Sequence, residues 1–111
     1  MKTDIKNIRF DRTKAPYDCE ILELDSFFKR LTSFSYFGKA ERIHFFIVFM
    51  ITGGKGRHFV DFKEYALQKG DLLFIAPGQI QQYENNPQYK GYMLIFTEDF
   101  FRKQPKELAF L

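Results

Sequence analysis

The chain has 111 residues and a formal net charge of +3 at pH 7, a length that favours a single domain. Hydrophobic residues make up 45% of it and charged residues 28%, a balance that excludes a disordered polar chain. Fifteen Phe and six Tyr, with no Trp, favour β-strands and thick apolar layers.

Residues 1–20 are predicted to form an N-terminal arm that precedes the folded domain, residues 21–111. Residues 1–14 carry five basic and two acidic side chains, whereas the rest of the chain carries twelve of each. A charge-neutral body has no general attraction for phosphate, so any contact with nucleic acid would have to come from the arm. The alternative, and the commoner state of such an arm, is a solvated segment.

The first part of the domain is predicted to hold one strand and one helix. Residues 21–24 favour a short strand, because apolar side chains dominate them. Asp25 and Ser26 follow as a helix cap, and the apolar positions of residues 27–31 recur at helical spacing.

From residue 42 onward, short apolar segments alternate with turn residues at intervals of roughly 8–12 residues, which is typical of an all-β sandwich or barrel. Residues 43–52 favour a central strand, because they are apolar on both faces. The glycines of residues 53–56 supply the positive φ angles of a hairpin. Thr97 is predicted to cap a final helix. Further turns are predicted at residues 63–64, 69–71, 77–78 and 84–87.

The single cysteine, Cys19, excludes an internal disulfide and favours a reducing, cytoplasmic location. The longest apolar run, residues 45–51, is far shorter than the ~20 residues of a membrane-spanning helix. Residues 1–6 mix both charge signs and lead into no apolar segment typical of a secretion signal. A cytoplasmic protein with no membrane partner is therefore expected.

The order of the glycine and proline turns resembles that of small-barrel cupins. Over residues 41–101 the sequence is closer still to the N-terminal ligand-binding domain of AraC-family bacterial transcription regulators. The resemblance implies an all-β fold, a small cupin-type jelly-roll barrel with short flanking helices. It is carried by Gly54, His58, Val60, Asp61, Phe62, Tyr65, Gly70, Asp71, Leu72, Phe74, Ile75, Pro77, Gly78, Gln79, Gly91, Tyr92, Phe96 and Thr97.

The resemblance also implies a function: an effector-sensing and dimerisation domain that binds a small organic molecule, such as a sugar or small metabolite, without catalysis. Regulators of this family bind DNA through a C-terminal domain of two helix-turn-helix units, and these 111 residues contain no such helix pair. We therefore expect a homodimer that does not bind DNA specifically by itself. The alternative is a standalone small cupin enzyme acting on a sugar or related polar metabolite.

Neither a metal site nor a catalytic set is predicted. Metal-binding cupins use three histidines and a glutamate, and the corresponding positions here are Glu41, Ile43, Ile47 and Gln81. An imidazole–carboxylate cage cannot form from these residues, so no cofactor is expected. His44 and His58 are predicted to have structural or surface roles, and Glu41 and His44 should face opposite ways on an alternating strand. Cys19 and the serines lack the surroundings of a nucleophile.

The predicted ligand site is the interior of the barrel. The odd-numbered residues of the strand 43–52 are expected to point inward. The resemblance places Gln81 inward, and strand alternation brings Tyr83 to the same side. A neutral small molecule would stack on Tyr83 and bond to Gln81; the alternative is a packed core in which Gln81 bonds to the backbone. The predicted ligand-binding residues are Ile47, Phe49, Gln81, Tyr83, Met93 and Ile95.

Overall fold

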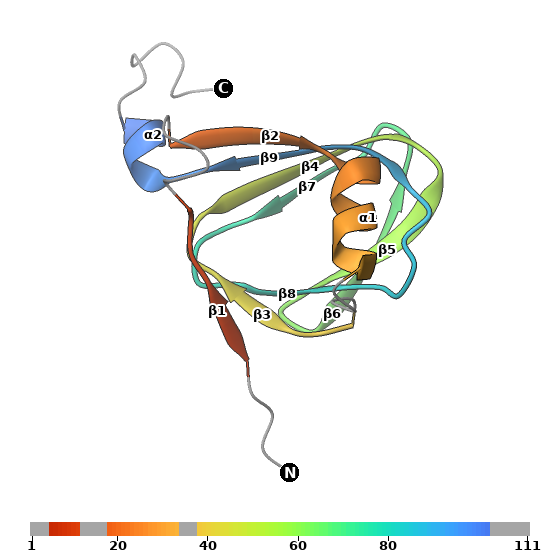
Figure 1. Ribbon diagram of the computed structural model, residues 1–111, viewed down its shortest axis with the longest axis horizontal. Coiled ribbons are helices and arrows are strands. Elements are labelled where there is room, and N and C mark those ends of the chain that lie inside the picture. Colours follow the sequence, from red (N-terminus) through yellow and green to blue (C-terminus); the bar gives the residue numbers. More distant parts are fainter. Residues whose placement is uncertain (1–4, 12–17, 34–37, 103–111) are drawn as a thin grey trace.

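Short strands dominate the computed structural model, which describes residues 5–11, 18–33 and 38–102 (Figure 1). The described part contains two helices, α1 (Leu24–Ser33) and α2 (Glu98–Arg102). The strands are β1 (Lys6–Ile8), β2 (Cys19–Glu23), β3 (Glu41–Ile43), β4 (Phe46–Gly53), β5 (Lys55–Val60), β6 (Lys63–Gln68), β7 (Leu72–Ile75), β8 (Ile80–Tyr83) and β9 (Lys90–Phe96). The all-β prediction is confirmed.

Two sheets enclose the core, one in the order β1-β3-β8-β5-β6 and the other in the order β2-β9-β4-β7. Their pairings are antiparallel except for β1 with β3, which run parallel. Among the described strands, β5 and β6 are the one consecutive pair that stays in a single sheet. The chain otherwise crosses between the sheets, which is the connectivity of the predicted jelly-roll barrel.

Strand alternation decides which side chains enter the barrel. All the odd-numbered side chains from 43 to 51 are buried, as predicted, and Gln81 and Tyr83 are buried on the same side of β8. Burial of the apolar side chains stabilises the fold by roughly 25 cal/mol per Å² of apolar surface removed from water. The residues predicted to lie inward on this strand are Ile43, Phe45, Ile47, Phe49 and Ile51.

The predicted strand over residues 43–52 is wrong in one respect, because the chain bends within it. β3 ends at Ile43 in one sheet and β4 begins at Phe46 in the other. At the bend, the backbone N–H of His44 donates to the carbonyl of Ile8 at 3.0 Å. The change of sheet therefore falls inside an apolar run that carries no Gly or Pro to mark it.

The predicted hairpin at residues 53–56 is also wrong. β4 pairs with β7 and β9, and β5 pairs with β6 and β8, so the glycines connect the two sheets. Gly54 has a φ of +74°, and a Cβ there would lie 2.6 Å from the carbonyl oxygen of Gln88. Both the conformation and the close approach require glycine.

The turn predicted at residues 63–64 instead lies at Asp61 and Phe62, whose φ angles are +51° and +65°. Positive φ at non-glycine residues is uncommon. Here the Asp61 carboxylate accepts hydrogen bonds from the Ile80 N–H and the Gln79 side chain, each at 3.0 Å. These bonds to the segment that enters β8 hold a turn that propensity alone does not favour.

Helix α1 stands beside the barrel between the two sheets (Figure 1). It begins at Leu24, so the prediction that Asp25 and Ser26 form its cap is wrong; both lie in its first turn. β2 ends at Glu23, so it passes directly into the helix, and Leu24 at the junction is fully buried. Phe28, one turn on, packs its ring 5.3 Å from that of Tyr89.

The two ends of the described chain are attached to the barrel. β1 aligns Ile8 with Ile43 of β3, and Phe10 packs edge-on against Phe45 at 6.1 Å. At the other end, the Thr97 hydroxyl accepts a hydrogen bond from the Phe100 N–H at 3.1 Å, which confirms the predicted cap. No helix in the described ranges has the length and apolar character needed to cross a membrane.

Candidate functional site

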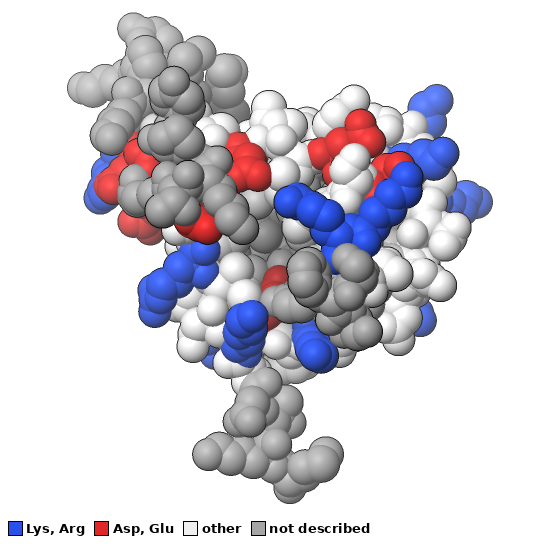
Figure 2. Space-filling view, in the orientation of Figure 1, with Lys and Arg blue, Asp and Glu red and all other residues white. Residues whose placement is uncertain are grey.

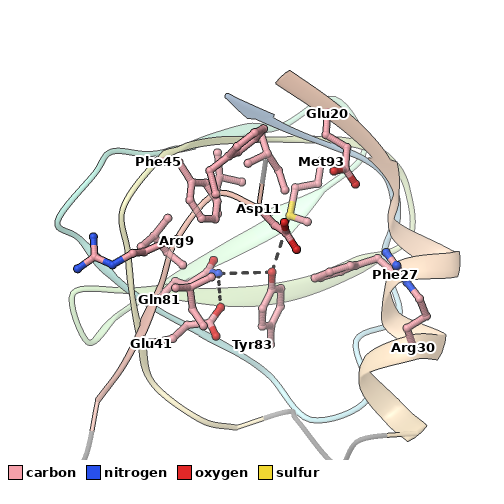
Figure 3. A pocket seen from close by; sticks show the side chains of 15 residues that line it. Arg9, Asp11, Glu20, Phe27, Arg30, Glu41, Phe45, Gln81, Tyr83 and Met93 are labelled. Atoms are coloured by element: carbon pink, nitrogen blue, oxygen red, sulfur yellow. Dashed lines mark hydrogen bonds between the residues drawn. The ribbon is translucent and has the colours of Figure 1, made fainter. Parts of the chain in front are cut away.

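A cavity of about 290 Å³ lies inside the barrel, where the sheets meet α1 and the segment that follows β1 (Figure 3). This volume is at the lower end of ligand pockets and suits a small metabolite. One wall is apolar and consists of Ile43, Phe45, Ile47, Met93 and Ile95. The polar side chains of its floor are Glu41, Gln81 and Tyr83, and those nearer its rim are Arg9, Asp11, Glu20 and Arg30.

The structure brings most of the predicted ligand-binding residues together. Phe49 is the exception, because it is fully buried beside the cavity without lining it. Its ring lies 4.8 Å from that of His58 and 6.3 Å from that of Tyr83. Five of the six line the cavity, namely Ile47, Gln81, Tyr83, Met93 and Ile95. That they bind a ligand remains a prediction.

A chain of hydrogen bonds runs from the core to the cavity floor. His58 Nε2 lies 2.9 Å from Gln81 Oε1, and Gln81 Nε2 donates to Glu41 Oε1 at 2.7 Å. A longer contact of 3.5 Å joins Gln81 Nε2 to the Tyr83 hydroxyl, which in turn donates to Met93 Sδ at 3.7 Å. The last three bonds are drawn in Figure 3. Gln81 thus connects three neighbours at once.

The protonation states along this chain follow from its geometry. Burial lowers the pKa of His58 to about 4, although its hydrogen bond to Gln81 acts in the opposite direction. His58 is therefore neutral at pH 7. The Gln81 amide turns its NH₂ group toward the Glu41 carboxyl group and its oxygen toward His58, and an amide oxygen can only accept a hydrogen bond. His58 consequently carries its proton on Nε2.

The amide of Gln81 positions its neighbours. Its oxygen accepts from His58, and its NH₂ group contacts both Glu41 and Tyr83, so its hydrogen-bonding capacity is largely used. The packed-core alternative predicts that the Gln81 side chain bonds to the backbone, whereas these three partners are side chains. The groups that Gln81 orients, the Glu41 carboxylate and the Tyr83 hydroxyl, are the better candidates for contact with a ligand.

Charges of both signs surround this end of the barrel. Figure 2 shows basic side chains gathered over α1 and acidic side chains over α2. In Figure 3 the Asp11 carboxylate points toward the centre of the cavity, whereas the Arg9 guanidinium points away from it. Arg30 also borders the cavity, with its guanidinium over the ring of Phe27, so the rim carries charges of both signs.

Sequence reasoning missed several residues of the cavity, for different reasons. Glu41 was considered only as the residue at a position where other cupins carry a metal ligand, although that position already implied an inward side chain. Phe27, whose ring lies 5.9 Å from that of Tyr83, could have been found from the apolar face of α1. Nothing in the sequence near Asp11 indicated that the segment after β1 would border the cavity.

The cavity lining offers few groups for catalysis. It includes no His, Cys, Ser or Lys among the described residues. His44 lies apart, with Nε2 2.8 Å from Asn7 Oδ1, so it does not share a site with Glu41. Burial, reinforced by the charge of Glu20, raises the pKa of the Cys19 thiol and makes that thiol a poor nucleophile.

The four positions that the cupin resemblance assigns to metal ligands all line the cavity, as Glu41, Ile43, Ile47 and Gln81. Two of these side chains are hydrocarbon and one is an amide, and the described residues contain no group of three His, Cys, Asp or Glu suited to a metal. We expect protein purified without chelator to contain far less than one zinc, iron or manganese ion per chain by elemental analysis. A stoichiometric transition metal would contradict this expectation.

Comparison with known proteins gives one family and several similar structures. A family model described as the AraC-like ligand binding domain matches residues 25–109. A protein described as a predicted oxalate decarboxylase from Thermotoga maritima is 14% identical, with a TM-score of 0.48 over 79% of this chain and 75% of that one. The EutQ protein of Clostridium difficile is 16% identical, with a TM-score of 0.44 over 79% of this chain and 62% of that one. A cupin protein from Bacteroides fragilis is 22% identical, with a TM-score of 0.40 over 70% of this chain and 75% of that one. No curated protein matches.

Proposed function

The chain belongs to the AraC-like ligand binding domain family, and from this premise we propose that it is the effector-sensing part of a transcription regulator. It binds a small organic molecule in the barrel cavity without changing it chemically. The proposal also includes a homodimer, a cytoplasmic location, and DNA binding only through a C-terminal domain outside these 111 residues.

The observation that carries this proposal is the cavity itself. Its wall is apolar, whereas its floor holds a buried carboxylate and a buried hydroxyl that Gln81 keeps in place. Apolar walls with a few fixed polar groups are typical of sites that bind small molecules. The lining holds no nucleophile–base pair in the described residues, which favours binding over catalysis.

The floor favours a ligand that carries hydroxyl groups. The Tyr83 hydroxyl donates to the sulfur of Met93, a weak acceptor that a ligand oxygen could replace with advantage. The Glu41 carboxylate is an acceptor and suits a ligand O–H. A hydroxyl group can meet both requirements, since it donates and accepts. A neutral sugar or polyol fragment, with its carbon face toward Ile47 and Met93, is the ligand class that we propose.

This proposal is tested by a thermal-shift screen of sugars, polyols and small hydroxylated metabolites. We expect at least one compound to raise the melting temperature of the chain. Tyr83→Phe, which removes only the hydroxyl, should weaken binding of that compound by about 3- to 10-fold, the worth of one hydrogen bond. Titration of wild type and variant gives the two dissociation constants.

Tyr65→Phe provides the matched control, because Tyr65 is exposed on β6 and does not line the cavity. Its affinity should equal that of the wild type. If no compound stabilises the protein, or if Tyr83→Phe binds every hit as the wild type does, the cavity is only an imperfectly packed core.

A standalone enzyme acting on a polar metabolite is the second candidate. The buried carboxylate of Glu41 is the observation in its favour, since such a group can act as a general acid or base. The two candidates differ in what happens to a bound hit. Mass spectrometry after prolonged incubation would recover it unchanged from a sensor and altered from an enzyme.

A further inference from the structure

The aromatic ring of Tyr83 is enclosed, although its hydroxyl reaches the cavity (Figure 3). Tyr83 exposes 2% of its surface, and the contacts of its ring with Phe28, Phe49 and His58 are edge-on. Phe27 adds a tilted contact, with the two centroids 5.9 Å apart. A ligand in the cavity can therefore bond to the hydroxyl of Tyr83, but it has no access to a face of this ring.

Phe27 differs from Tyr83 because it is only half-buried while it lines the same cavity. Its side chain points from α1 into the cavity, and Phe45 enters from the opposite side (Figure 3). Phe45 exposes 5% of its surface, and its ring packs edge-on against Phe10. Compared with Phe45 and Tyr83, Phe27 therefore has more of its ring left for contact with a ligand.

Neighbouring side chains hold the ring of Phe27 in place. The guanidinium carbon of Arg30, three residues further along α1, lies 5.7 Å from the centre of the ring in a cation–π contact. The ring also packs at tilted angles against Phe28 and Tyr83, with centroids 6.1 and 5.9 Å away. A side chain that is already fixed loses little conformational entropy when a ligand binds to it.

We propose that Phe27 is the aromatic platform of the ligand site, and that the ligand is a cyclic sugar or cyclitol rather than a linear polyol. The C–H groups on one face of a saturated ring are slightly positive and pack against the negative face of an aromatic ring. The other face can meet the aliphatic wall of Ile47 and Met93, while the hydroxyl groups at the edge reach Glu41 and Tyr83 on the floor. The inference rests on the proposed function, because it names the ligand class of the same cavity.

A ring suits this site better than an open chain for a second reason. A linear polyol has several freely rotating C–C bonds, and fixing them in the cavity costs conformational entropy that a ring has already lost. A linear polyol also lacks an unbroken face of C–H groups to place on Phe27. The cyclic member of a matched pair should therefore bind more tightly than the linear one.

Matched pairs of probes test the proposal with the full chain. The pairs are xylose with xylitol and glucose with glucitol, which differ in ring closure but carry similar hydroxyl groups. Isothermal titration calorimetry of the wild type should show tighter binding of the cyclic member in at least one pair. Phe27→Leu keeps an apolar side chain but removes the aromatic ring, so it should weaken binding of that cyclic sugar by about 3- to 10-fold. Phe27→Tyr, which restores a ring, should recover the affinity.

A second measurement needs no variant and separates contact from a structural role. In the wild type, nuclear Overhauser contacts should join the ring protons of Phe27 to C–H protons of the bound cyclic sugar. Phe62→Leu is the matched control, because Phe62 lies in the exposed turn between β5 and β6 and does not line the cavity. Its affinity for the cyclic sugar should equal that of the wild type.

Each outcome decides the proposal. Equal affinities of Phe27→Leu and the wild type for the cyclic sugar would overturn it, and so would tighter binding of the linear member in both pairs. Absence of the Overhauser contacts with a bound sugar would also overturn it. In these three cases a sugar or polyol still binds, so the sensing proposal survives. If none of the four probes binds, the platform proposal fails, and the broader thermal-shift screen decides the sensing proposal separately.

Discussion

Gly91→Ala is expected to destabilise the chain by about 4 kcal/mol, the sum of an overpacked core and a strained backbone. Gly91 has a φ of +148°, a conformation that side chains rarely adopt, and a Cβ there would overlap the carbonyl oxygen of Met50. It would also lie 3.1 Å from the Cα of Ile51. β9 is an inner strand between β2 and β4, so relief of this overlap would disturb both pairings.

Urea denaturation followed by circular dichroism measures this effect. Gly53→Ala is the matched control, because Gly53 lies opposite the start of β9, beyond a register shift after Ile51, and a Cβ there meets nothing within 4 Å. Its free energy of unfolding should stay within about 0.5 kcal/mol of the wild type. Equal losses in the two variants would mean that the close approach of β4 and β9 does not require glycine.

The second large effect concerns pH. The free energy of unfolding is expected to fall by about 3 kcal/mol as the pH drops from 6.5 to 4, through the protonation of His58 alone. This figure converts the difference between the unfolded and folded pKa values of His58 at about 1.36 kcal/mol per unit. His58 takes up a proton near its ordinary pKa of 6.5 in the unfolded chain, but only near 4 in the folded one. As the pH falls, the unfolded state binds the proton first. The contribution of neutral His58 to the stability of the folded state is therefore complete above pH 6.5 and declines below it.

The physical cause of this sensitivity lies in the surroundings of the ring. A second proton on His58 would go to Nδ1, a buried atom without a hydrogen-bond partner among the described residues. The ring is also enclosed by aromatic neighbours, with the rings of Phe49 and Tyr83 each 4.8 Å away. No hydrogen-bond partner in the described part of the chain compensates the added charge at that nitrogen, so the folded state resists protonation.

Unfolding free energies at several pH values between 7 and 4 test this, with His58→Gln as the comparison. The glutamine amide can still donate to Gln81 but does not titrate, so the His58-specific slope should vanish while the slope from carboxylates remains. The difference between the two curves isolates His58. Parallel curves would show that His58 gains its proton in the folded chain as readily as in the unfolded one.

The sequence by itself determined the class of fold and the inward residues. Alternation has a period of two in any strand, so the burial of Ile47, Phe49 and Ile51 follows from the order of residues alone. The turn at residues 69–71 was predicted for the same kind of local reason. Gly70 has a φ of +94°, which its missing side chain permits, and the Asp71 carboxylate accepts from the Gln68 N–H at 2.8 Å.

Only the tertiary structure decided where the sheets exchange strands and what the polar core does. The glycines at residues 53–56 permit a sharp reversal, but whether it forms a hairpin or crosses between sheets depends on which partners occupy the edges of β4. The partners of Gln81 are 23 residues away at His58 and 40 residues away at Glu41. Propensity and periodicity act over a few residues, whereas such pairs are chosen by the packing of the whole barrel. The fold was therefore predictable from the sequence, but the hydrogen-bond partners of the polar residues in its cavity were not.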